Sequence, residues 1–180
     1  MKNSKNHVSY ITRAAVVAAI YFACTYVMYS FGSGAIQLRL SEALCVLPLL
    51  MPEAVPGLFI GCLIANLIGG GAVWDVIFGS LTTLAAAYLT YKVGYKKPGV
   101  KTSRYWLAVS FPVILNAVIV GAVVWACYGF SGFGVTDKQT FGYLPLTMLT
   151  VGIGEAIAVY VFGTVLYQAV YRLPDSLLSK

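Results

Sequence analysis

Residues 105–128 of this chain read YWLAVSFPVILNAVIVGAVVWACY, an apolar run without a single charged side chain. A helix needs about 20 consecutive apolar residues to cross the hydrocarbon core of a bilayer, so this run is long enough for one crossing. The rest of the chain has the same character, since 59% of its 180 residues are hydrophobic and only 10% are charged. Soluble domains usually carry about 25% charged residues. The sequence therefore predicts an all-α integral membrane protein.

Other apolar runs lie on both sides of this one, and together they predict six transmembrane helices. The expected spans are residues 10–31, 39–51, 54–68, 75–92, 105–128 and 143–171. The second and third runs are shorter than the usual span of about 17–25 residues, so they form either thin or tilted spans or a re-entrant hairpin. We expect residues 1–180 to form a single membrane domain.

Basic residues predict the orientation of this domain. Ten of the twelve Lys and Arg residues lie within residues 2–13, 92–104 or 172–180. Cytoplasmic loops carry an excess of Lys and Arg, so both termini are expected in the cytoplasm. We interpret the net charge of +6 as a sign of this orientation and not of nucleic-acid binding.

Several polar side chains interrupt or flank the apolar runs, and the predicted topology directs them to the outer half of the membrane. A charge at membrane depth costs about 2.5–3.5 kcal/mol on insertion scales, so such residues usually have a function. The candidates for a shared ligand site are Arg39, Glu42, Asn66, Trp74, Asp75, Asn116 and Glu155. They come from five different predicted helices, which makes a common pocket geometrically feasible.

Most of these residues have a structural alternative. Arg39 and Glu42 are three positions apart and can neutralise each other across one helical turn. Asp75 follows a glycine-rich turn and can cap the helix that begins there. Asn66 and Asn116 can hold helices together by interhelical hydrogen bonds.

A purely structural role is harder to assign to Glu155. It lies between Gly154 and Ala156, with no basic residue within a helical turn. Two carboxylates, amide side chains and a tryptophan suit a flat heterocycle that has hydrogen-bond donors on its edge, although an amine or a cationic vitamin would fit the same residues. Glu155 would accept from the ring edge, Asp75 or Glu42 would pair with a cationic arm, and Trp74 would stack on the ring, which is worth about 1–3 kcal/mol.

Cysteine and histidine usage argues against metal and catalytic chemistry. The four cysteines lie in apolar runs without a CxxC pair, and the basic N-terminus holds the single histidine, His7. We therefore expect no metal site, no cofactor and no enzymatic activity. The sequence also contains no GxxxxGK[ST] loop, so it cannot hydrolyse ATP in the P-loop manner.

Small residues recur on the first and third runs and predict close helix packing. The row in the third run is Gly57, Gly61, Ala65 and Gly69, for which we favour internal packing. The rows in the first run include Ala14, Ala15, Ala18 and Ala19. For these alanines, internal packing and a docking face for another protein are both open.

Four stretches resemble the queuosine-precursor transporter family (QueT-type). They are IQLRLSEAL at 36–44, the block 57–87 with GCLIAN and WDVIFGSLTTLAA, PVILNAVIVG at 112–121 and GIGEAIAVYVFG at 152–163. The first two stretches are distinctive, and together the four span nearly the whole chain.

The resemblance implies a six-helix substrate-binding S component of an energy-coupling-factor (ECF) transporter in a bacterial plasma membrane. Such a protein would capture a 7-deazaguanine derivative at its outer face and work with a membrane coupling subunit and two ATPase subunits. Ala14, Ala15, Ala18 and Ala19 would then form the docking face, and the aromatic loop 129–134 would close over the ligand.

A different class of transporter fits the same residues. A stand-alone secondary transporter or channel for a small cation or vitamin would use the carboxylates as proton or ion relays. Such a protein would need no ATPase, so dependence of uptake on the proton gradient would distinguish it from an ECF-type importer.

Overall fold

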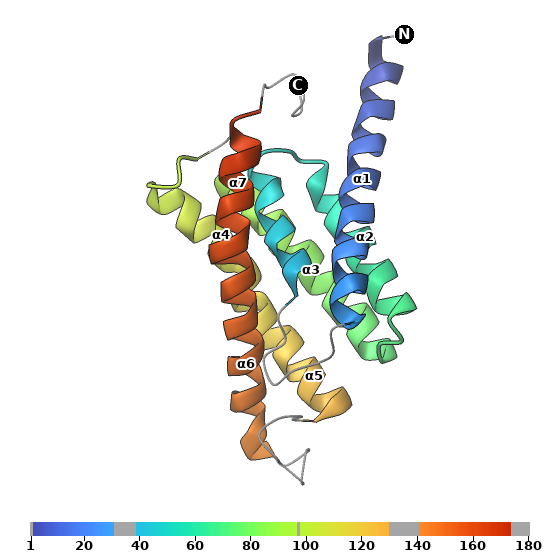
Figure 1. Cartoon of the computed structure of the whole chain (residues 1–180), viewed down its shortest axis with the longest axis vertical. Coiled ribbons are helices and arrows are strands. Elements are labelled where there is room, and N and C mark those ends of the chain that lie inside the picture. Colours follow the sequence, from blue (N-terminus) through green and yellow to red (C-terminus); the bar gives the residue numbers. More distant parts are fainter. Residues whose placement is uncertain (1, 31–38, 97, 130–140, 174–180) are drawn as a thin grey trace.

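The computed structural model describes residues 2–30, 39–96, 98–129 and 141–173, and every regular element among them is a helix. The first half contains α1 (Lys2–Ser30), η1 (Leu40–Leu49), α2 (Ala54–Ile68) and α3 (Val73–Gly94). The second half contains α4 (Ser103–Leu115), η2 (Asn116–Val120), α5 (Gly121–Tyr128), η3 (Phe141–Tyr143), α6 (Leu144–Ala156), η4 (Ile157–Gly163) and α7 (Thr164–Tyr171). The predicted all-α fold is therefore confirmed for the described residues (Figure 1).

Four helical stretches are long and apolar enough to cross a membrane. They are His7–Met28, Val73–Gly94, Ser103–Tyr128 and Phe141–Tyr171, the last two being continuous through their π-helical segments η2 and η4. The start of α1, the connection from α3 to α4 and the end of α7 lie at the same end of the bundle (Figure 1). Because the described chain starts and ends at the same end of the bundle, it crosses the bundle an even number of times, as predicted.

The two short predicted spans form an antiparallel pair of helices, η1 and α2 (Figure 1). A 3-10 helix rises about 2.0 Å per residue and an α-helix about 1.5 Å, so each of these helices extends for little more than about 20 Å. Neither therefore matches the hydrocarbon core of about 30 Å. A 3-10 helix of ten residues is unusually long, and this one contains Pro48.

The helix η1 lies inside the bundle and not on its surface. Every residue from Ser41 to Leu49 is buried, and η1 packs against α1, α3 and η4. Close contact with η4 is possible because Gly163 has no side chain: a Cβ there would lie 2.8 Å from Val46 Cγ1. The beginning of η1 is thus placed among the long helices.

The glycines of α2 allow α1 to approach closely. A Cβ on Gly57 would lie 2.7 Å from the carbonyl oxygen of Ala14, and one on Gly61 would lie 2.8 Å from that of Ala18. Both distances are too short for a real contact, so only glycine fits. The prediction that these glycines serve internal packing is confirmed.

The outer surface of the bundle remains apolar. For example, more than half of the surface of each of three apolar residues is exposed: Leu67, Leu107 and Val165. A helix surrounded by lipid presents apolar side chains outward, and its backbone polar groups are satisfied within the helix. The exposed apolar faces are therefore those expected of a multi-pass membrane protein.

Candidate functional site

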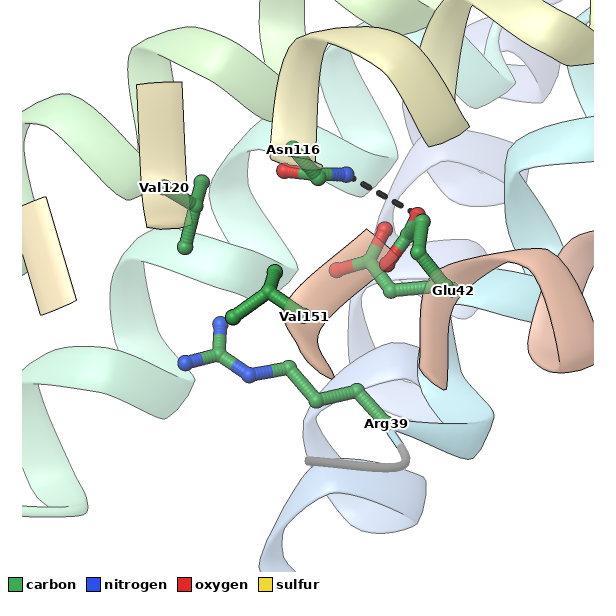
Figure 2. Close-up of a pocket in the computed structure, with 6 residues that line it drawn as sticks. Arg39, Glu42, Asn116, Val120 and Val151 are labelled. Atoms are coloured by element: carbon green, nitrogen blue, oxygen red, sulfur yellow. Dashed lines mark hydrogen bonds between the residues drawn. The ribbon is translucent and has the colours of Figure 1, made fainter. Parts of the chain in front are cut away.

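A pocket lies where η1, η2 and α6 meet, and its total empty space is about 250 Å³, including the part open to the outside. The described residues that line it are Arg39, Glu42, Asn116, Val120, Val151 and Glu155 (Figure 2). The two valines supply apolar wall, and the other four supply charge or hydrogen-bonding groups.

Glu155 and Asn116 face each other across this pocket. Asn116 Nδ2 donates a hydrogen bond of 2.9 Å to Glu155 Oε1, and each residue is only 4% exposed. Asn116 is the first residue of η2, and Glu155 lies two positions before η4. Because π-helical segments occur frequently at functional sites, their position on both walls supports a binding role for this pair.

Glu42 brings a second carboxylate to the same pocket. It is 2% exposed, and its two oxygens accept hydrogen bonds from different donors. The hydroxyl of Tyr21 donates to Oε1, and the thiol of Cys45 donates to Oε2 over 3.1 Å. The carboxylate is therefore held in place by α1 and by its own helix.

Arg39 is the one cationic residue among the described pocket residues. It immediately precedes η1, and its side chain extends along the pocket toward Val120 and Val151 (Figure 2). When Glu42 and Glu155 are both ionised, the guanidinium balances one of the two negative charges. A buried charge without compensation is costly, so the pocket favours a ligand that carries positive charge or several hydrogen-bond donors.

Asp75 and Asn66, which the sequence grouped with these residues, lie together but outside the pocket lining. Both are buried, at 3% and 1% exposed, and both flank Gly79. A Cβ there would lie 3.2 Å from Asn66 Nδ2 and 3.4 Å from Asp75 Oδ1. Within the described part of the chain, Asp75 Oδ1 accepts no hydrogen bond.

The capping alternative for Asp75 is not observed. Helix α3 begins at Val73 with Ala72 as its N-cap, so Asp75 is already the third helical residue. Trp74 is 62% exposed and stacks on Phe78 with ring centroids 6.0 Å apart. Trp74 is not among the residues that line the pocket, so stacking on a ligand would require contact outside it.

The four candidate docking alanines divide between two faces of α1. Ala14 and Ala18 are buried, because α2 covers them through Gly57 and Gly61. Ala15 and Ala19 are exposed. Only Ala15 and Ala19 are thus available on the open face of this helix.

The structure adds four residues that sequence reasoning missed: Tyr21, Cys45, Val120 and Val151. Tyr21 had a recognisable signal, because a tyrosine within a buried helix usually needs a partner for its hydroxyl. Cys45 lies three positions after Glu42, within one turn of η1. The valines had no such signal, since any apolar residue of a span could form a wall. Residues 130–134 of the expected closing loop lie outside the described residues.

Comparison with known proteins identifies one family. A family model with the description QueT transporter matches residues 11–172, a range that includes every residue of the pocket. No curated protein and no solved structure matches the chain.

Proposed function

Because the chain belongs to the QueT transporter family, we propose that it is the substrate-capture subunit of an ATP-driven ECF-type importer for a queuosine precursor. The family assignment makes the protein a membrane transporter component. The observation that supports the finer proposal is the buried pair of Glu155 and Asn116 in a small pocket that Glu42 and Arg39 also line.

The proposed ligand is a 7-deazaguanine derivative, whose ring edge matches the pocket. A guanine-like edge offers N1–H and an exocyclic amine, which the carboxylate of Glu155 can accept together. Asn116 orients that carboxylate through its hydrogen bond. The ring carbonyl is an acceptor, to which the guanidinium of Arg39, which also lines the pocket, would donate.

A cationic arm on the ring would pair with Glu42. The sequence left Asp75 and Glu42 as equal candidates for this role, and Glu42 is the one that lines the pocket.

The proposed partners are a membrane coupling subunit and two ATPase subunits. The chain itself has no P-loop, so the ATP hydrolysis that drives the proposed importer would take place in such a module. The exposed Ala15 and Ala19 on α1 are the proposed docking residues, because small side chains let another helix approach closely. The proposed orientation places both termini and the basic loop 92–104 in the cytoplasm.

The proposal is tested by thermal-shift titration of the purified protein with 7-aminomethyl-7-deazaguanine, queuine, guanine and thiamine. A ligand that binds only the folded state stabilises it by about 2.7 kcal/mol at 100 times its Kd. We expect a deazaguanine to raise the Tm selectively. If none of the four compounds raises it, the substrate assignment is wrong.

The second candidate is a stand-alone transporter for a small cation, and the two buried carboxylates of one pocket favour it. Uptake by cells distinguishes the two functions. An ECF-type importer stops working when the ATPase subunits are deleted, whereas a stand-alone transporter stops when the proton gradient is collapsed and is indifferent to that deletion.

A further inference from the structure

Tyr21 of α1 reaches the pocket only through Glu42. Its hydroxyl donates a hydrogen bond to Glu42 Oε1, while its own side chain is 1% exposed. The described residues that line the pocket include none from α1. Tyr21 can therefore affect a bound ligand only indirectly, by fixing the position of the Glu42 carboxylate.

A second contact ties the beginning of η1 to the same helix. Thr25, one turn after Tyr21, donates a hydrogen bond of 2.8 Å to Ser41 Oγ, and Ser41 directly precedes Glu42. Helix α1 is itself held firmly, because a Cβ on Gly61 would lie 2.8 Å from Tyr21 Cβ. The support behind Glu42 is thus a closely packed pair of helices and not a flexible segment.

Resting on the function proposed above, we propose that Tyr21 is a positioning residue that holds Glu42 as the acceptor for the cationic arm of the ligand. A carboxylate has about four lone-pair sites on its two oxygens. Tyr21 and Cys45 each occupy one, so sites remain for a ligand. Without the tyrosine hydroxyl, the carboxylate loses one of the two donors that fix its orientation, and the ligand then has to order it at a cost in affinity.

The test is Tyr21→Phe, with Tyr167→Phe as the matched control. Tyr167 is also 1% exposed and also donates one hydrogen bond, of 2.8 Å, but to the carbonyl oxygen of Pro98 away from the pocket. Affinities are measured by titration calorimetry for two ligands that differ in the amine, 7-aminomethyl- and 7-methyl-7-deazaguanine. We expect Tyr21→Phe to weaken the amine-bearing ligand about tenfold and to leave the methyl ligand within about twofold, whereas Tyr167→Phe changes neither.

A double-mutant cycle separates positioning from packing. In a Glu42→Gln background, Tyr21→Phe is expected to have no further effect on the amine-bearing ligand. An equal loss for both ligands, or an undiminished loss in the Glu42→Gln background, would overturn the proposal, because either result would make Tyr21 a packing residue only.

Cys45→Ala removes the other donor to Glu42 and is expected to cause a smaller loss with the same ligand selectivity. This variant tests the same carboxylate when Tyr21→Phe lowers the yield of folded protein. The two proposals fail differently. A wild-type protein that binds neither ligand contradicts the proposed function, whereas one that binds both and is insensitive to Tyr21→Phe contradicts the positioning role alone.

Discussion

Glu42 and Glu155 present two carboxylates to one pocket, and their surroundings suggest different tasks. Glu155 is supported by a neutral amide, Asn116, which donates one hydrogen bond to its carboxylate. Glu42 is supported by the hydroxyl of Tyr21 from α1 and by the thiol of Cys45 from its own helix. Each residue is nearly inaccessible, so both carboxylates are largely shielded from solvent.

Glu155→Gln is expected to weaken binding of a deazaguanine ligand by at least about tenfold, because a hydrogen bond to a charged group contributes about 1.5–3 kcal/mol. The glutamine keeps a carbonyl oxygen that accepts from Asn116, so the ligand-free protein should fold normally. Titration calorimetry gives the affinity, and thermal denaturation checks the fold. Unchanged affinity would remove Glu155 from the site.

Glu42→Gln and Asp75→Asn form a matched pair, since both remove a buried carboxylate charge and only Glu42 lines the pocket. We expect Glu42→Gln to weaken an amine-bearing ligand about tenfold or more. Asp75→Asn should leave the affinity within about twofold. Calorimetry that gives the opposite order would show that Asp75 holds the cationic arm.

At the scale of the element, the pocket depends on the unusual helices around it. The 3-10 helix η1 carries Glu42, the π-helical segment η2 begins at Asn116, and the π-helical segment η4 begins two residues after Glu155. Glycines let these helices meet: a Cβ on Gly163 would lie 2.8 Å from Val46 Cγ1, and one on Gly121 would lie 2.8 Å from Met148 Cα. The spacing of the two carboxylates therefore depends on close helix packing as well as on their hydrogen bonds.

Gly163→Ala should push η4 away from η1 and thereby separate Glu155 from Glu42. The added methyl would also lie 3.2 Å from the carbonyl oxygen of Ala43, so the backbone has to move. We expect a loss of about 1–3 kcal/mol in stability, the usual cost of overpacking, together with weaker ligand binding.

Gly99→Ala is the control for this change, because a Cβ there would meet only Thr102 Oγ1, at 3.6 Å. Chemical denaturation in detergent measures the stability of both variants. A Gly163→Ala protein as stable as Gly99→Ala would show that η1 and η4 can separate without cost.

At the scale of the whole molecule, short and long helices are combined in one membrane protein. Four stretches are long enough to cross a bilayer, whereas η1 and α2 are shorter. A helix too short to cross the bilayer would leave the backbone polar groups at its ends in lipid, where they have no partners. Because η1 is buried inside the bundle, its ends meet protein instead. The same placement brings Arg39 and Glu42 into the interior.

The orientation of the bundle can be tested with single cysteines at its two ends. Lys101 lies in the basic loop after α3, and Val73, which is 69% exposed, begins α3 at the opposite end. In intact cells, a membrane-impermeant maleimide should label Val73→Cys, whereas Lys101→Cys should react only after permeabilisation. The wild-type protein, whose four cysteines are buried or half-buried, is the control. The reverse pattern would place both termini outside.

The sequence by itself determined that the chain is a helical membrane protein and where its helices lie. The range predicted as 75–92 became α3 at Val73–Gly94, and 105–128 became Ser103–Tyr128. The physical reason is that long apolar runs have to satisfy their backbone hydrogen bonds internally, which leaves the helix as the available structure.

Only the tertiary structure decided which polar side chains meet. Trp74 and Asp75 are neighbours in sequence, yet one is 62% and the other 3% exposed, because consecutive residues point about 100° apart around a helix. Hydropathy contains no information about the rotation of one helix against another. That rotation is set by contacts such as the one between Gly61 and Tyr21. As a result, Glu42 and Glu155 line the same pocket, whereas Asp75 lies beside Asn66 outside it.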